Sequence, residues 1–365
     1  MFMIKKLYEN LIKLRLPNGL YIASTGEFYR QFCWLRDCFY ESLPSLYFDP
    51  DLYVQAYHTI LDYLKKLESE YRKFSSMIEN PTDETWCHLH ARVSAETCWE
   101  VHTHWQNKQD DICGELLYGI SLGEERGLKI IRDSEDVQII NLLIKYMEAI
   151  EYWHHSDSGY WEEDESHGGR SSSIGICVAG LNAIQKLNRS DIIIPENLIM
   201  KGKAALSRLL PKETKDRDVD MALLSLIWPF KVVNVKQRNE ILFNVESRLV
   251  RDYGCIRYIG DQYYNADYSN PLGNEAQWTL GDLYLANIYI DIGDHKKGEH
   301  YLYKVLKKCP DGNIPELYVN GVPNCNLILG WSNALAILAI MKLEGIYEGV
   351  SDRREFDIIR NSSDL

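Results

Sequence analysis

The sequence predicts an all-α protein, and three observations support this fold class. Apolar residues recur at intervals of three and four along most of the chain, which is the period of an amphipathic helix. Segments with strand character are few, and the clearest of them is 254–259. The chain has 365 residues with 45% hydrophobic content and no Pro- or Ser-rich linker, so we expect residues 1–365 to form a single domain.

The helical period predicts about twelve helices. In chain order, they lie at 4–14, 36–47, 51–76, 110–126, 134–154, 172–188, 194–209, 217–227, 235–249, 276–292, 294–307 and 331–344. Asp49 and Pro50 mark the start of the third helix, because Asp can cap a helix and Pro presets the dihedral of its first turn. Pro195 opens the seventh helix in a similar way.

Charge and composition exclude some partners and favour another. The net charge of −13 and the sequence pI near 5.3 argue against nucleic acid, since phosphate binding needs clustered Lys and Arg. No apolar run approaches the roughly 20 residues of a membrane helix, so no membrane partner is expected. The 24 Tyr and 9 Trp supply flat amphipathic rings, which suit stacking on a sugar.

Cysteine usage and the first residues predict a cytoplasmic protein. The nine cysteines are scattered singly without a C-x-x-C pair, which is typical of reduced thiols and argues against a disulfide framework. Residues 1–6 lead directly into an amphipathic pattern, without a long apolar region or a small-residue cleavage site, so no secretory signal is visible.

Two His-x-His pairs raise the alternative of a zinc site. His88-Leu89-His90 and His102-Thr103-His104 lie near Cys87 and Cys98, and both residue types can bind zinc. Their spacing fits no common zinc pattern, and alternating histidines are often simply hydrogen-bonded. We therefore predict no metal and no cofactor.

Conspicuous polar and aromatic clusters precede five of the predicted helices, namely the second, fourth, sixth, tenth and twelfth. The clusters are 34–37, 105–111, 161–163, 257–264 and 315–316. Short connections favour antiparallel neighbours, so every connection from an odd to an even helix lies at the same end of the bundle. We therefore expect all five clusters to share one face. Each tryptophan in them has a plainer alternative as a core residue.

Four consecutive carboxylates follow an aromatic step in the segment 159–165. An acid held against Trp161 and short of water would have a raised pKa, which is the condition for a general acid near neutral pH. The alternative is a solvated acidic loop. The same-end argument pairs Glu162 with Glu316, and two carboxylates facing across a cleft can divide glycosidic hydrolysis between an acid and a base. Glu316 by itself could also be a surface residue before a helix.

Five motifs in this order give the chain a family resemblance. They are Trp34-Leu35-Arg36-Asp37, then Trp105 with Gln109 and Asp111, then Trp161-Glu162, then Arg257-Tyr258-Ile-Gly-Asp261-Gln-Tyr263-Tyr264, and finally Pro315-Glu316 followed by Gly330-Trp331-Ser332. The chain resembles glycoside hydrolase family 15, the glucoamylases, and the related glucoamylase-like domains of the phosphorylase kinase α and β subunits. The resemblance covers about Leu16 to Leu343. It implies an (α/α)6 barrel of about twelve helices with an active-site cleft at one end.

The resemblance also implies roles for residues of this chain. Glu162 matches the general acid and Glu316 the base of the family. The substrate-binding residues expected from it are Trp34, Arg36, Asp37, Trp105, Gln109, Asp111, Trp161, Glu163, Arg257 and Trp331. Arg36 and Asp37 have the alternative of a structural ion pair at a helix start.

These observations predict an inverting, exo-acting glycoside hydrolase that releases glucose from the non-reducing end of short α-glucosides. We expect neither an amino-terminal β-sandwich nor a starch-binding domain. The base then activates a water, so the two carboxyl groups should stand roughly 6.5–9.5 Å apart. Two alternatives stay open. One is a catalytically silent glucan-binding or regulatory module like the phosphorylase kinase domains, which 90–92 and 219–226 resemble. The other is a trehalase-type α-glucosidase.

Overall fold

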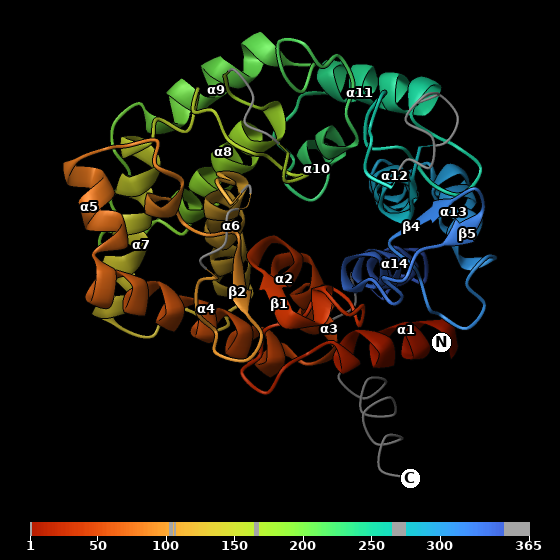
Figure 1. Cartoon of the computed structure of the whole chain (residues 1–365), viewed down its shortest axis with the longest axis horizontal. Helices are drawn as coiled ribbons and strands as arrows, with labels where there is room; N and C mark the ends of the chain where they lie inside the picture. Colours follow the sequence, from red (N-terminus) through yellow and green to blue (C-terminus); the bar gives the residue numbers. More distant parts are fainter. Residues whose placement is uncertain (1, 102–104, 106, 164–167, 265–274, 347–365) are drawn as a thin grey trace.

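The computed structural model describes residues 2–101, 105, 107–163, 168–264 and 275–346. Its helices form two concentric rings around a common axis (Figure 1). The inner ring consists of α2 (Leu35–Ser42), α6 (Asp111–Glu125), α8 (Ser171–Lys186), α10 (Leu224–Ile227), α12 (Thr279–Asp291) and α14 (Gly330–Leu343). The outer ring consists of α1 (Phe2–Lys13), α4 (Pro50–Tyr71), α7 (Ser134–Ala149), α9 (Leu198–Leu209), α11 (Val235–Arg248) and α13 (His295–Leu306). This arrangement confirms the predicted (α/α)6 barrel.

The shorter elements lie in the connections. They are α3 (Ser45–Phe48), α5 (Lys73–Glu79), the 3-10 helices η1 (Tyr29–Gln31), η2 (Thr85–Cys87) and η3 (Met221–Leu223), and the strands β1 (Phe32–Trp34), β2 (Arg92–Ser94), β3 (Gln277–Trp278), β4 (Leu317–Val319) and β5 (Val322–Pro323). None of the helices in the described part of the chain is both long and apolar enough to cross a membrane.

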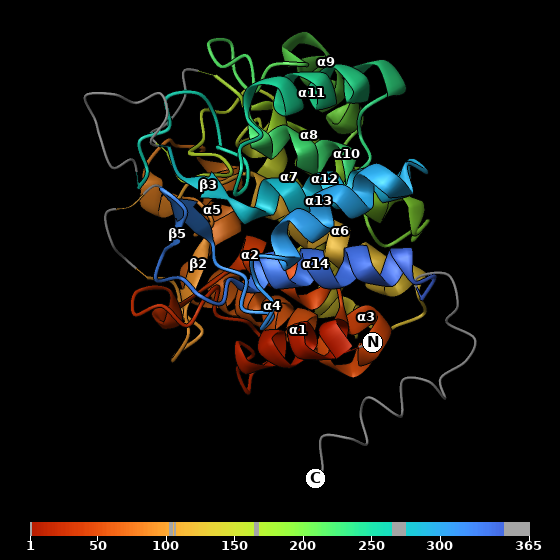
Figure 2. The same ribbon diagram turned by 90° about the vertical axis from the view of Figure 1, so that its right-hand side faces the viewer.

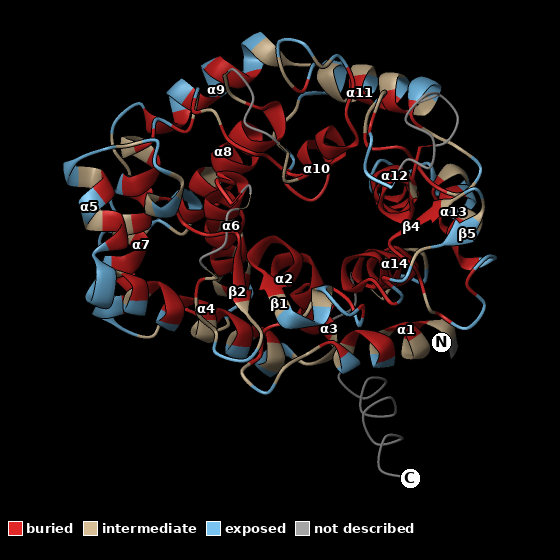
Figure 3. Cartoon of the chain, viewed as in Figure 1, coloured by how far each residue is buried: buried red, intermediate tan, exposed pale blue. Residues whose placement is uncertain are grey.

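Side-chain polarity separates the two rings. Every residue of α2 is buried, as are all of α12 up to Ile290 and all of α14 up to Met341, whereas α11 buries only Ile241, Leu242 and Val245 (Figure 3). A helix that is apolar on all sides is stable only inside a protein, while one with a single apolar stripe covers a core from outside. The inner helices are the even-numbered helices predicted from the sequence, and the outer helices are the odd-numbered ones.

The inner helices α6 and α8 approach so closely that their backbones touch. A Cβ atom on Gly180 would lie 2.2 Å from the carbonyl oxygen of Gly114, and one on Gly114 would lie 2.3 Å from that of Ile176. Only glycine leaves room for such an approach. These two glycines therefore fix how near α6 and α8 stand to each other.

Each predicted helix has a counterpart, but several local expectations differ from the structure. The helix predicted at 51–76 is split, because Arg72 adopts a left-handed conformation with φ of 51° between α4 and α5. The helix predicted at 217–227 is not helical at 217–220, and the rest of it consists of the 3-10 turn η3 followed by the single turn of α10. Pro50 does occupy the first turn of α4, but the side chain of Asp49 makes no capping bond.

Two further expectations need correction. The predicted strand at 254–259 is wrong, because within it only Cys255 forms β-bridges, one to Val250 and one to Trp278. The seventh helix begins at Leu198, after Asn197 in a left-handed conformation, and not at Pro195. The start of α9 depends on the backbone conformation of one residue, Asn197. The pairing of Cys255 depends on a partner distant in sequence, Trp278.

Two small antiparallel sheets lie at the end of the barrel where inner helices begin. Strand β1 pairs with β2 in the register Phe32↔Ser94, and strands β3, β4 and β5 form the second sheet. Strand β1 runs directly into α2, and β3 runs directly into α12. Figure 2 shows β2, β3 and β5 gathered at this one end. Pairing of the strands thus fixes Trp34 and Trp278 just ahead of two inner helices.

Candidate active site

A pocket with a volume of about 80 Å³ opens at the end of the barrel that carries the sheets. Eight of the predicted site residues line it, namely Trp34, Arg36, Asp37, Trp161, Glu162, Arg257, Glu316 and Trp331. They come from connections that precede different inner helices or from the first turns of those helices. The predicted clustering on one face is therefore present in the structure. Trp105, Gln109, Asp111 and Glu163 do not line the pocket.

Arg36 organises the side of the pocket around Glu162. Its Nη2 lies 2.9 Å from Oε1 of Glu162, and its Nη1 donates a 2.7 Å hydrogen bond to Oε1 of Gln109. Asp111 lies beneath it, at 3.8 Å from Nη1. Burial alone would lower the pKa of Arg36, but Glu162, Asp37 and Asp111 outweigh that effect and raise it. Gln109 and Asp111 thus hold a permanent cation against Glu162.

Asp37 also faces the pocket, close to the same cation. One of its oxygens lies 3.8 Å from Nε of Arg36, and the residue is 5% exposed. Burial raises the pKa of Asp37 to about 7, although Arg36 opposes the shift. Arg36 and Asp37 therefore form an ion pair with each other, and both also line the pocket.

The backbone turn that carries Glu162 is tight. Glu162 has a φ of 60°, in the left-handed region, and its N–H donates to the carbonyl of Gly159, whose φ is 63°. A Cβ atom on Gly159 would lie 2.3 Å from Cδ of Arg170, so the turn needs glycine there. Left-handed backbone costs about 1–3 kcal/mol for a residue other than glycine and occurs preferentially at functional sites. This conformation turns Glu162 into the pocket.

The neighbouring carboxylate of Glu163 is held outside the pocket by arginines. Arg217 binds both of its oxygens, at 2.6 and 2.9 Å, and Arg170 lies 3.1 Å from Oε2. Burial raises the pKa of Glu163, but the bonds from Arg217 outweigh it and lower the pKa below the ordinary value. Of the two adjacent glutamates, only Glu162 is available to a ligand in the pocket. Asp164 and Glu165 lie outside the described residues.

Neutral hydrogen-bond donors surround Glu316, which also lines the pocket. Its carboxylate accepts bonds from the Tyr29 hydroxyl at 2.8 Å and from the side-chain amides of Asn324 at 2.6 Å and Asn326 at 2.7 Å. Burial raises the pKa of Glu316, and the bonds from Asn326, Tyr29 and Asn324 oppose this shift. The hairpin β4–β5 begins directly after Glu316 and brings the two asparagines back over it.

Aromatic rings and a second arginine, Arg257, also line the pocket. The guanidinium of Arg257 lies 5.6 Å from the ring centre of Trp161 and 4.9 Å from that of Trp278, and Asp261 holds it with two 2.7 Å bonds. The indole of Trp161 donates to Asp220 at 2.8 Å. These contacts fix the indole faces that border the pocket.

Further aromatic rings and an arginine pack around Trp34. Trp105 contacts Trp34 edge to face at a centroid distance of 6.2 Å, and the guanidinium of Arg92 lies 4.0 Å from the ring centre of Trp105. His90 also stacks on Trp105. Trp105 therefore supports a wall residue rather than bordering the pocket itself.

The predicted site residues did not include several residues that shape the site. They are Tyr29, Tyr160, Asp220, Trp278, Asn324 and Asn326. Trp278 is preceded by a cluster in the sequence, and Tyr29 lies in an aromatic run before Trp34, so a search for aromatics near the predicted clusters would have found both. The two asparagines gave no local signal, because their role depends on the hairpin.

Comparison with known proteins identifies the family of the chain. The family model described as glycosyl hydrolases family 15 matches residues 3–222. The chain is 28% identical over 314 residues to the phosphorylase b kinase regulatory subunit alpha, liver isoform, of Mus musculus, over 72% of this chain and 25% of that protein. It is 28% identical over 311 residues to the skeletal muscle isoform of Oryctolagus cuniculus, over 70% of this chain and 25% of that protein. The chain thus spans about a quarter of the length of these curated relatives.

Solved structures share the fold. A glycosidase in complex with glucose superposes with a TM-score of 0.77 at 18% identity, over 94% of this chain and 96% of that one. The glucoamylase of Saccharomycopsis fibuligera superposes with a TM-score of 0.63 at 16% identity, over 94% of each chain. At these identities the likeness shows the (α/α)6 architecture and leaves activity to be argued from the pocket.

Proposed function

The chain belongs to glycosyl hydrolases family 15, and from this premise we propose that it is an inverting, exo-acting hydrolase that releases glucose from the non-reducing end of short α-glucosides. One observation carries the proposal. Glu162 and Glu316, from connections 154 residues apart, line one pocket and have different surroundings. Two carboxyl groups in unlike environments can take the two roles that glycoside hydrolysis needs.

In the proposed reaction, Glu162 donates a proton to the glycosidic oxygen as the bond to the anomeric carbon breaks. Glu316 removes a proton from a water that attacks that carbon from the opposite face. Burial raises the pKa of Glu316, which strengthens it as a base, while Tyr29 and the two asparagines keep its charged form accessible.

The same pocket offers groups for the hydroxyls of a terminal sugar. Arg36 supplies N–H donors and Asp37 supplies acceptor oxygens, both at the wall of the pocket. The rings of Trp161, Trp278 and Trp331 supply flat apolar faces of the kind that pack against a sugar. We propose these residues as substrate contacts, with Trp34 and Arg257, while Trp105, Gln109, Asp111 and Glu163 position them.

We further propose that residues 1–365 act as one catalytic domain without a cofactor. A reducing compartment such as the cytoplasm fits the nine cysteines, which are all free thiols. The curated relatives favour a second candidate function, because they are regulatory subunits. In that alternative the pocket binds a glucan end without cleaving it. A trehalase-type specificity is a variant of the first proposal.

A panel of α-linked disaccharides that includes trehalose tests the proposal through detection of released glucose. We expect release from at least one, and the glucose from the attacked unit should appear first as the β-anomer in proton NMR, because attack from the opposite face inverts an α-linkage. The leaving glucose keeps the anomeric configuration that it had in the substrate, which is α in trehalose. An initial excess of α-glucose over the amount that the leaving sugar supplies would contradict the inverting mechanism. No release from any substrate, together with calorimetric binding of an α-glucan oligosaccharide, would establish the silent binding module instead.

A further inference from the structure

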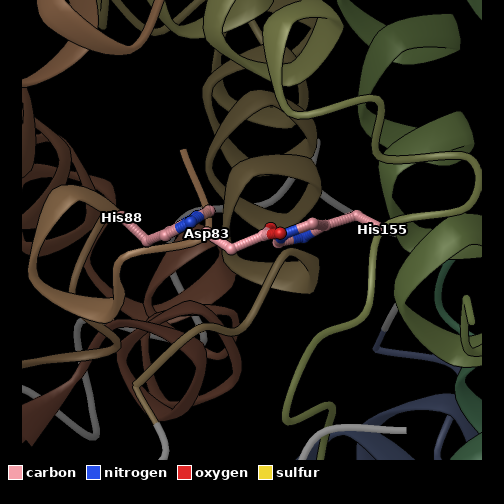
Figure 4. Close-up of side chains that lie close together, drawn as sticks. All are labelled: Asp83, His88 and His155. Atoms are coloured by element: carbon pink, nitrogen blue, oxygen red, sulfur yellow. The ribbon is translucent and has the colours of Figure 1, made fainter. Parts of the chain in front are cut away.

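Away from the pocket, three metal-ligating side chains converge. Asp83, His88 and His155 each offer one ligand atom, and these atoms lie within 4.8 Å of one another (Figure 4). Asp83 and His88 flank the turn η2, and His155 lies in the connection between α7 and α8. The segments are far apart in sequence, so tertiary structure alone brings the side chains together. None of the three lines the candidate active site.

His155 has the geometry of a histidine prepared to bind a metal. Its Nδ1 lies 2.7 Å from an oxygen of Asp110, which fixes this nitrogen as the donor. Its Nε2 is buried, has no hydrogen-bond partner among the described residues, and lies 3.7 Å from Oδ1 of Asp83. Metal-bound histidines usually have this arrangement, in which one ring nitrogen donates to a carboxylate and the other is left for the metal.

His88 supplies a second buried imidazole beside the first. The two rings stack with centroids 5.0 Å apart, and His88 is 1% exposed. Its Nδ1 lies 3.3 Å from the Tyr146 hydroxyl, and its Nε2 lies 3.0 Å from the carbonyl oxygen of Thr82. A carbonyl only accepts, so Nε2 donates to Thr82 before a metal binds. Metal binding would move the proton to Nδ1, beside the Tyr146 hydroxyl, and would leave the lone pair of Nε2 and the carbonyl oxygen as ligands.

The surroundings of the two rings favour a cation. Asp110 binds Nδ1 of His155, and the carboxylate of Asp157 accepts from the backbone N–H of Asp110 at 3.2 Å. Two carboxylates therefore lie behind the proposed ligands.

Asp83 can complete the coordination by a small movement. Ligands of a tetrahedral zinc stand about 3.3 Å apart, given metal distances of roughly 2.0–2.2 Å. The side chain of Asp83 is 90% exposed and is free to rotate toward the two fixed rings. The two buried rings are held by their hydrogen bonds, and the exposed carboxylate is the ligand with most freedom to adjust.

We propose that Asp83, His88 and His155 form a binding site for one divalent transition-metal ion, with zinc as the best match. Two imidazoles and one carboxylate suit zinc and its neighbours, whereas calcium and magnesium prefer oxygen ligands alone. The proposal departs from the absence of metal expected from the sequence. Of the four histidines in the two His-x-His pairs, only His88 is a proposed ligand. The other two proposed ligands, Asp83 and His155, are not part of any zinc-binding spacing pattern in the sequence. His102 and His104 lie outside the described residues.

The site would join the η2 turn to the connection that carries Glu162. That connection runs from His155 through Asp157, whose carboxylate accepts from the Asp110 backbone at 3.2 Å, to the tight turn at Gly159. A bound ion would therefore stabilise the segment ahead of the proposed acid without touching the substrate.

Calorimetric titration with zinc of the full chain, previously treated with a chelator, tests the proposal. We expect one equivalent to bind the wild type, and Asp83→Asn and His155→Gln to weaken binding at least tenfold. Glu84→Gln and His154→Gln change an exposed carboxylate and an exposed histidine adjacent to the ligands, so they are matched controls that should bind like the wild type. Zinc should raise the melting temperature of the wild type and of both controls, but of neither ligand variant.

Cobalt binding identifies the ligands independently. Co²⁺ should give visible absorption typical of nitrogen and oxygen ligands, and Asp83→Asn should need at least tenfold more Co²⁺ to reach half of its full absorption. Because Asp83 is exposed, this variant folds even if His155→Gln does not. An intense ultraviolet thiolate band, or equal zinc affinity in Asp83→Asn and the wild type, would place the ion elsewhere and overturn the proposal. Absence of zinc binding to the wild type would overturn it as well.

Discussion

The two carboxylates of the candidate active site are held in opposite ways. Glu162 sits on a left-handed turn and pairs with a buried arginine, which is itself compensated by other carboxylates. Glu316 sits beside a regular hairpin and is bound by uncharged donors, one phenol and two amides. We refer to the surroundings of Glu162 as the acid side and to those of Glu316 as the base side.

This contrast explains how two identical side chains can take different roles. Charged partners on the acid side depend on each other, because removing one leaves others buried without compensation. Neutral donors on the base side each contribute separately to the charged form of one carboxylate. The acid side should therefore respond to substitution through stability, and the base side through the pH dependence of the reaction.

The largest effect is expected for the two glutamates themselves. Glu162→Gln and Glu316→Gln should each lower kcat/KM roughly a thousandfold or more, since each removes a proton-transfer group, with circular dichroism unchanged. Glu163→Gln is the matched control, because its carboxylate is directed to Arg217 and should matter far less to rate. Loss of activity in Glu163→Gln with near-normal turnover in Glu162→Gln would move the acid by one residue.

The next largest effect distinguishes the two sides by stability. Arg36→Ala removes a buried cation and leaves Asp111 and neighbouring carboxylates uncompensated, so it should cost about 3–5 kcal/mol of unfolding free energy. Asn326→Ala on the base side should cost about 1 kcal/mol, the usual worth of one hydrogen bond. Urea denaturation of both variants measures the difference. Equal losses would show that the two sides do not differ in their interdependence.

A smaller effect should appear on the base side as a change in pH dependence. Tyr29→Phe removes a donor that favours the charged form of Glu316, so the pKa of Glu316 should rise further. The acidic limb of the kcat/KM profile would then move to higher pH, since the base must be deprotonated to act. Tyr160→Phe, which changes a second pocket tyrosine whose hydroxyl bonds Tyr40 and Tyr284, should leave that limb in place. An unmoved limb in Tyr29→Phe would argue against Glu316 as the base.

The smallest effect concerns the pH dependence of stability on the acid side. Burial raises the pKa of Asp111 to about 7, although Arg36 opposes the shift. A carboxyl whose pKa is higher in the folded state contributes stability at low pH that is lost as pH rises through the folded pKa. Unfolding free energy should therefore fall by about 1 kcal/mol from pH 6 to pH 8 through this group. Asp111→Asn should flatten the profile, and an unchanged slope would contradict the assignment.

The sequence by itself determined the helical class, the approximate helices and the end of the barrel where the site lies. Helical periodicity is a local property, and uniform burial of α12 or α14 follows from their lack of a polar face. The alternation of inner and outer helices then follows from short antiparallel connections. For this reason the order of the helices along the chain is enough to place Glu162 and Glu316 at the same end of the barrel.

Only the tertiary structure decided how each carboxylate is held. The bond from Tyr29 to Glu316 joins residues 287 positions apart, and the asparagines reach Glu316 only because a hairpin reverses the chain. The direction of Glu162 depends on a left-handed backbone that its own residue type does not favour. Such features leave no periodic pattern and no compositional signal in the sequence, since they arise from packing between distant segments. The convergence of His88 and His155 arises from the same kind of long-range packing.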